Sequence, residues 1–334
     1  MSRHFCAVVL CLFIGREAIA QAGDQSFRFV DIPSHARITG LGGVLVSQPG
    51  MDVNLVLSNP AQSTDSLNGN FSFSYLDYFA DTKKFQAAYQ HNLGKAGSWF
   101  VAVDHLSYGD FDGFDDTGQD IGEFDAGETV IMTGTSRQVG LFRLGGSLKF
   151  LSSQLAGYSA SALALDLGGT FLHPEKDVSV GLVFRNLGVV LSDYDDTREA
   201  SLPFDVQAGV TFKPKFMPFR FSFTAHHLTD WSLENFREED KPGAFDQVLR
   251  HLAIGTELLI HKNVELRFGY NHRVRTDLAV DNTGGGSGFT YGLVFNMKGV
   301  GFAYSRGGYS AASGANSLTL ILDTERVFSK KIKI

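Results

Sequence analysis

The sequence is short of cysteine, proline and long apolar runs, and each shortage narrows the possible structures. Its two cysteines, Cys6 and Cys11, both lie in an apolar run near the start of the chain. Once that run is removed as a leader, no thiol is left for disulfides, cysteine–zinc sites or thiol catalysis. Only 8 prolines occur among 334 residues, which favours uninterrupted strands. No apolar stretch approaches the roughly 18 residues of a membrane-spanning helix.

The beginning of the chain predicts export. Arg3 and His4 precede the apolar run 5–14, and the tripeptide 18–20 reads Ala-Ile-Ala, an A-x-A cleavage pattern. We therefore expect residues 1–20 to be a secretory signal peptide, and the protein to be bacterial. The net charge of −7 gives no indication of nucleic-acid binding.

What the chain has in abundance is period-two alternation, from Asn70 onward. In the segment VELRFGYNHR, Val264, Leu266 and Phe268 fall on one face, and Glu265 and Arg267 fall on the other. The same pattern predicts about fourteen strands, several longer than the usual sandwich strand. They are expected near 70–78, 83–92, 97–107, 127–137, 140–153, 158–172, 177–188, 203–213, 218–229, 248–261, 263–274, 287–297, 299–307 and 316–326.

The connections between these segments alternate in length. Short turns such as LGKAG and HKN alternate with longer loops, notably 108–126, 189–202, 230–247 and 275–286. An even strand count with short turns at one end and long loops at the other is typical of an outer-membrane β-barrel. A soluble β-sandwich is the alternative interpretation of any one strand. That fold gives no reason for the connections to be sorted by length. We expect the turns to face the periplasm and the apolar faces to meet lipid.

Few patterns suggest a chemical site. No G-x-S-x-G motif is present, and the neighbours His226 and His227 are expected to project to opposite faces of a strand. The segment 108–128 holds eight acidic residues and no basic one, but it lacks the spacing of an EF-hand calcium loop. The sequence DNTGGGSG lacks the lysine and the helix of a phosphate-binding loop. We predict no catalytic residue, no metal site and no cofactor.

The segment before the strands contains ARITGLGG and then Asn59-Pro60-Ala61, an Asn-Pro turn. This order, just ahead of a fourteen-stranded barrel, resembles the FadL-like outer-membrane proteins. The resemblance implies that residues 21–69, including Asn59, Pro60 and Ala61, fold as a plug inside a barrel formed by residues 70–334. Irregular backbone is tolerated in such a lumen because protein and water surround it.

Longer stretches, among them FVDIPSHARITGLGG, PFRFSFTAHHLTDW and SRGGYSAASGANSLTL, resemble the PorV/PorQ family of the Bacteroidota type IX secretion system. The resemblance covers nearly the whole chain after the signal. It implies a non-enzymatic barrel in the outer membrane of a Gram-negative bacterium. Such a barrel would anchor a PorZ-like surface protein in an attachment complex with the sortase PorU and with PorV, where cargo is joined to lipopolysaccharide.

Two other functions stay open on sequence grounds. A FadL-like transporter of hydrophobic small molecules would need an apolar pocket and a lateral opening. An outer-membrane enzyme would need a serine–histidine pair at matching strand heights. For the anchor, the contacts are expected on the long outward loops. The candidate contact residues are Phe114, Trp231, Phe236 and Arg237.

Overall fold

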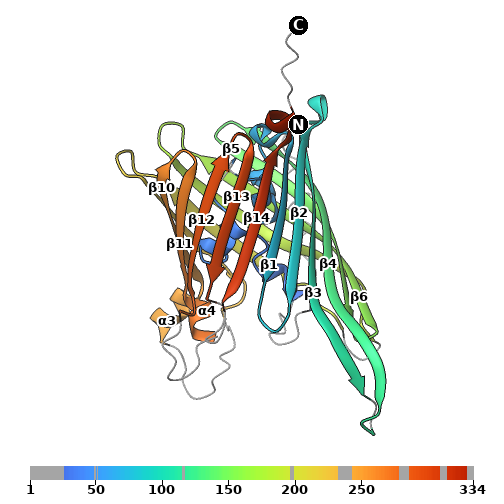
Figure 1. Cartoon of the computed structure of the whole chain (residues 1–334). Coiled ribbons are helices and arrows are strands. Elements are labelled where there is room, and N and C mark those ends of the chain that lie inside the picture. Colours follow the sequence, from blue (N-terminus) through green and yellow to red (C-terminus); the bar gives the residue numbers. More distant parts are fainter. Residues whose placement is uncertain are drawn as a thin grey trace.

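The computed structural model describes residues 26–48, 50, 52–114, 117–195, 199–231, 243–277, 286–308 and 314–328. Fourteen antiparallel strands form one closed barrel, in which consecutive strands pair and β1 closes against β14 (Figure 1). The predicted antiparallel barrel of about fourteen strands is therefore confirmed. The expected signal peptide lies outside the described residues. Within the described ranges, no helix is both long and apolar enough to cross a membrane.

The strands vary widely in length. They are β1 (Asn70–Asp77), β2 (Lys83–Asn92), β3 (Ser98–Phe114), β4 (Asp120–Val139), β5 (Phe142–Leu155), β6 (Tyr158–Leu172), β7 (Val178–Ser192), β8 (Asp205–Phe212), β9 (Phe219–Ala225), β10 (Leu252–His261), β11 (Val264–Asn271), β12 (Phe289–Met297), β13 (Val300–Gly307) and β14 (Ala315–Asp323). Helices α3 (Ala244–Arg250), α4 (His272–Asp277) and α5 (Thr324–Phe328) and the short turn η5 (Gly94–Ala96) lie at the ends of strands.

Side chains alternate between the lumen and the outside of the barrel. In β11, Glu265 and Arg267 are buried, whereas Phe268 is half exposed on the outer surface. The predicted assignment of the two faces in this strand is confirmed. An arginine turned toward lipid at mid-membrane would cost about 2–4 kcal/mol, which fixes the register. The outer surface carries an apolar band that includes Val101, Val103, Leu148, Phe150, Leu182, Phe184, Leu293, Phe295 and Phe302.

The two ends of the barrel differ as the loop lengths predict. Helices α3 and α4 and the tip of the β3–β4 hairpin gather at one end, while α5 and the short turns lie at the other (Figure 1). We call these the loop end and the turn end. Outer-membrane barrels usually place their long loops outward and their short turns in the periplasm, and we expect the loop end and the turn end to be oriented in this way.

Two of the predicted long loops are wrong in extent, because the adjoining strands continue. β3 reaches Phe114 and β4 begins at Asp120, so most of 108–126 is a hairpin rather than a loop. Gly109 takes a left-handed conformation at a bulge, which lets the ladder resume beyond it. β7 likewise extends to Ser192, inside the predicted loop 189–202.

Other predicted strands end early. β9 stops at Ala225 and β11 at Asn271, short of the expected 229 and 274. His227 has a φ of 54°, which breaks the extended backbone after β9. The expected opposite projection of His226 and His227 is also wrong, because their Nδ1 atoms lie 2.7 Å apart across this turn.

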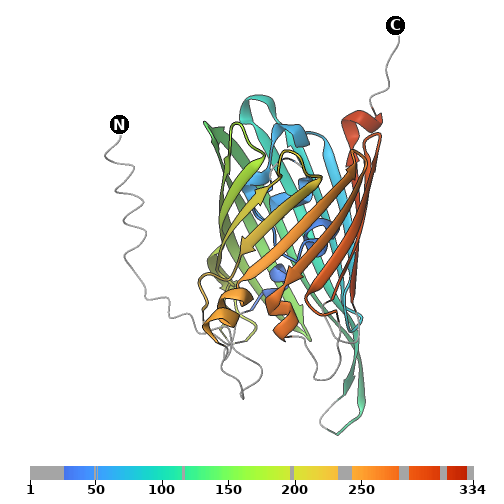
Figure 2. The same cartoon turned by 90° about the vertical axis from the view of Figure 1, so that its left-hand side faces the viewer.

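The described residues before β1 form an inner segment, residues 26–69, enclosed by the strands (Figure 2). It is built from single turns, which suit a chain that must bend repeatedly. These are η1 (Arg28–Asp31), α2 (Ala36–Gly40), η2 (Val53–Leu57), η3 (Pro60–Gln62) and η4 (Asp65–Leu67). Side-chain caps start two of them: Asp52 accepts a hydrogen bond from the Asn54 amide, and Asn59 accepts one from the Ala61 amide.

Candidate functional site: the filled lumen

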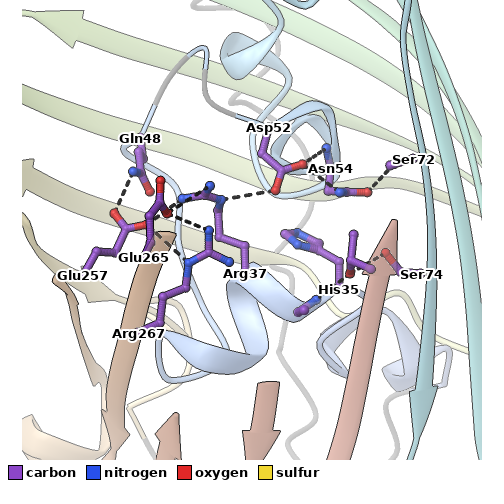
Figure 3. A network of polar contacts seen from close by, with 12 residues as sticks. His35, Arg37, Gln48, Asp52, Asn54, Ser72, Ser74, Glu257, Glu265 and Arg267 are labelled. Atoms are coloured by element: carbon purple, nitrogen blue, oxygen red, sulfur yellow. Dashed lines mark hydrogen bonds and ion pairs between the residues drawn. The ribbon is translucent and has the colours of Figure 1, made fainter. Parts of the chain in front are cut away.

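A charged network joins the inner segment to the barrel wall (Figure 3). Arg37 of α2 donates to Asp52 at 3.2 Å and to Glu257 of β10 at 2.6 Å. Arg267 of β11 donates to Glu265 at 3.1 Å and lies 3.5 Å from Glu257. All five side chains are buried, so each charge depends on its partners for compensation.

Two further side chains complete the network around Glu257. Arg220 of β9 donates to it at 3.1 Å, and Gln48 of the inner segment donates at 2.8 Å. Three arginines therefore face three carboxylates. Burial opposes the charge on Arg37, but the surrounding carboxylates outweigh burial and raise the pKa of its guanidinium. Burial likewise opposes the charge on Asp52, yet Arg37 leaves the pKa of this carboxyl below its ordinary value.

Neutral polar groups extend the network toward β1 and β2. Asn54 accepts hydrogen bonds from Ser72 at 2.5 Å and from Gln86 at 2.8 Å, while its own amide donates to Asp52 at 2.7 Å. His35, directly before α2, is fully buried, and neither ring nitrogen has a hydrogen-bond partner among the described residues. Burial lowers the pKa of His35 to about 4, against the opposing field of Asp52. The imidazole is therefore neutral at physiological pH.

The Asn59-Pro60-Ala61 turn lies on the opposite wall, against β5 and β6. Asn59 donates to the Val46 carbonyl at 2.8 Å, which ties two parts of the inner segment together. Glycines make room for the turn: a Cβ on Gly145 would come within 2.5 Å of Ala61, and one on Gly168 would overlap the Asn59 side chain. The three residues are thus buried lumen residues. That the inner segment acts as a plug remains a prediction.

The lumen near the loop end contains an apolar cluster. We call its cluster around Phe27 and Phe29 the outer cluster; the buried wall residues are Leu106, Val130, Leu151, Ala160, Ala162 and Ala164. Full burial of each phenylalanine stabilises the fold by about 1.5–3 kcal/mol. Lys84 of β2 fastens this part, because its ammonium donates to the carbonyls of Phe29 and Ile32 and pairs with Asp104 at 3.1 Å.

The wall beside the outer cluster has an interrupted ladder. The β6–β7 register shifts between Leu165 and Leu167, and Asn186 at the bulge has a φ of 58°. β8 begins at Asp205, opposite Arg185, so within the described residues the part of β7 from 187 to 192 pairs only with β6. We call this place the β7–β8 step. The side chains that pack on the outer cluster from here are Val190, Tyr194, Ala200 and Leu202.

Of the predicted contact residues, Trp231 alone has a described side chain. It is half exposed at the loop end and packs against the ring of His251, with ring centroids 4.5 Å apart. Phe114 ends β3, but its side chain lies outside the described part, as do Phe236 and Arg237 entirely. Among the described residues, no group of three or more histidine, cysteine or acidic side chains is arranged to hold a metal ion.

Sequence reasoning placed Glu265 and Arg267 in the lumen but missed their partners. Arg37 and Glu257 are 220 positions apart, and no spacing rule connects them. The available signal was Arg37 itself, a charged residue inside the small-residue stretch ARITGLGG, since a charge in such a confined segment needs a partner.

Comparison with known proteins identifies a similar fold but no protein family. No protein-family model matches the chain, and no curated protein matches it. Among solved structures, a mutant of the monoaromatic hydrocarbon channel TodX has 12% identity and a TM-score of 0.51, covering 87% of this chain and 98% of that one. The toluene transporter TbuX of Ralstonia pickettii has 12% identity and a TM-score of 0.48, with 88% and 98% covered. Omp33, an outer membrane protein of Acinetobacter baumannii, has 10% identity and a TM-score of 0.37, with 76% and 95% covered. At these identities, the likeness to TodX shows a shared barrel fold.

Proposed function

We propose that the protein is an outer-membrane barrel that admits small hydrophobic molecules through its wall at the β7–β8 step. The observation that carries this proposal is the contact between that step and the outer cluster. There, an apolar part of the lumen adjoins a stretch of wall in which β7 is paired on one side only. An apolar molecule dissolved in the membrane would meet apolar side chains along this route.

The rest of the lumen limits what could follow the same route. A cavity of about 60 Å³ borders Val30 and Val130 but also the charged Lys149 and Arg185. Beyond it, the charged network ties the inner segment to β9, β10 and β11. Passage to the turn end therefore requires the inner segment to move. The fold shared with the TodX channel supports a transport function by analogy of fold.

The test fills the outer cluster without changing charge. Ala162→Phe adds a ring among Phe27, Phe29 and their neighbours, and Ala303→Phe adds the same ring at a buried alanine of β13, away from the step. Uptake of radiolabelled naphthalene would be measured in a Gram-negative host that lacks its own hydrocarbon channels. We expect a several-fold loss for Ala162→Phe alone. Equal uptake by cells with and without the wild-type barrel would sink the proposal.

A second candidate is the surface anchor of a secretion and attachment complex, with a PorZ-like partner beside PorU and PorV. It is favoured by the β3–β4 hairpin, which extends past the rest of the barrel (Figure 1). Phe111 and Phe124 stack there with ring centroids 5.4 Å apart and are 43% and 37% exposed, while Asp112 pairs in register with Glu123. Like charges set opposite each other weaken a hairpin. A binding role would explain why Asp112 and Glu123 are found opposite each other.

A further inference from the structure

A large hollow opens at the turn end, separate from the outer cluster and the β7–β8 step. It has a volume of about 500 Å³ and lies between the inner segment and strands β11 to β14. Arg37 and Arg267 border it on the network side. Lys262, Lys298 and Arg326 border it where the short turns and α5 lie. We call it the turn-end vestibule.

The charges around the turn-end vestibule do not cancel. Five cationic side chains line it, against the three carboxylates of Asp52, Glu265 and Asp323. The carboxylates are engaged, since Asp52 pairs with Arg37, Glu265 with Arg267, and Asp323 with Arg326 at 2.9 Å. Lys262 and Lys298 form no ion pair within the described residues. Two positive charges are thus left at the mouth of the hollow.

The floor of the hollow is polar. Arg267 is 1% exposed, and its Nε has no hydrogen-bond partner in the described part of the protein, with Glu257 3.5 Å away. The guanidinium is directed at the carboxylates of Glu257 and Glu265, which compensate its charge. The lining also includes the amides of Asn70, Asn263 and Asn296 and the hydroxyl of Ser66, so the hollow is largely polar.

We propose that the turn-end vestibule binds a phosphate group. Free phosphate carries about −1.5 to −2 charges at neutral pH, and both it and the anionic phosphodiester of a lipid headgroup offer several acceptor oxygens. This charge matches the two unpaired lysines, and the oxygens suit the guanidinium and amide donors deeper in the hollow. An uncharged or apolar molecule would leave the positive charge of the two lysines uncompensated. The proposal does not rest on hydrophobic transport, which concerns the opposite part of the lumen.

The same chemistry has two possible sources, free phosphate and the headgroup of a phospholipid in the adjacent leaflet. The test uses the full-length barrel purified in detergent. Isothermal titration calorimetry with inorganic phosphate reports the first source, and native mass spectrometry after addition of phosphatidylglycerol reports the second. The test variant is Lys262→Gln/Lys298→Gln. The matched control is Lys213→Gln/Lys215→Gln, in the β8–β9 turn at the same end but outside the hollow.

We expect at least one probe to bind the wild type, and the test variant to bind it about tenfold more weakly, because both positive charges at the mouth of the hollow are lost. The control should bind like the wild type. Lys262, Lys298 and Lys215 are exposed and Lys213 is half-buried in a turn, so both variants should keep the heat-modifiable folded band on gels. If neither probe binds the wild type, or if the test variant and control weaken binding equally, the proposal is overturned.

Discussion

Arg37 is the residue on which the placement of the inner segment depends most. It is buried and joins Asp52 of the same segment to Glu257 on the wall. Arg37→Met keeps the apolar stem but leaves Asp52 buried without its cation and takes one of three arginines away from Glu257. Breaking such a pair costs about 3–5 kcal/mol. We therefore expect a marked fall in the urea midpoint at which the barrel loses its folded band.

Two further variants separate charge from packing in that experiment. Arg326→Met removes an arginine from the ion pair with Asp323, but Arg326 is 77% exposed, so its effect should stay within about 1 kcal/mol. Arg37→Met/Asp52→Asn removes the cation together with the carboxylate that pairs with it alone, and keeps an acceptor for the Asn54 amide, so it should recover part of the loss. If Arg37→Met and Arg326→Met are equally stable, the network does not hold the inner segment in place.

At the scale of elements, the β3–β4 hairpin separates the two proposed functions. Replacing residues 111–124 with an Asn-Gly turn keeps Tyr108, which packs on the outer cluster, and should leave uptake of hydrophobic molecules unchanged because that cluster and the β7–β8 step remain. The same change should release a PorZ-like partner in pull-downs from native membranes. Trp231→Ala, at a predicted contact residue, should weaken the same complex. Full retention of the partner by both variants would place the anchoring surface elsewhere.

Point changes in the hairpin refine that prediction. Phe111→Ser/Phe124→Ser removes the stacked pair and should speed dissociation, since buried aromatic groups dominate interface energies. Asp112→Asn/Glu123→Gln should instead slow association and reduce its dependence on salt. Phe216→Ser is the matched control, because Phe216 is 91% exposed at the turn end. Surface plasmon resonance on the captured complex separates the two rates.

The elements also show where sequence patterns stop being informative. Alternation identified the strands inside the membrane because lipid demands one apolar face. Beyond the membrane both faces of β3 and β4 meet water, so neither face has to be apolar. Residues such as Phe111 and Asp112 therefore show no regular alternation, and the sequence predicts a loop where the structure has a hairpin. The left-handed backbone at His227 likewise cannot be recognised from the sequence, because the residue is not a glycine.

The site itself was only half predictable. The polar face of β11 was evident from Glu265 and Arg267, because charges facing lipid are costly. Their contacts with Arg37 and Glu257 depend on how an irregular segment folds inside the closed barrel, which no local pattern specifies. The roles of Gly145 and Gly168 were equally unpredictable. These glycines leave space for the Asn59 turn, which is distant from them in the sequence.

For the whole molecule, the inner segment decides whether the barrel is a closed wall or a pore. The strands alone form a closed ring, and their inward side chains include charged groups on several walls, such as Asp104, Lys149, Asp166 and Glu257. Such a lining would hold water if the inner segment were absent. A variant that keeps residues 1–25 and lacks 26–67 should therefore still insert, and should conduct ions in planar bilayers.

The wild type should show little conductance in the same bilayers, because buried residues of the inner segment fill the space between opposite walls. Arg37→Met should give brief openings with a conductance between those of the wild type and the deletion variant, since it loosens the inner segment without removing it. A variant lacking 26–67 that inserts yet conducts no better than the wild type would contradict the plug prediction. The strands would then have collapsed inward and shut the lumen, and the inner segment would serve to support the wall rather than to block a channel.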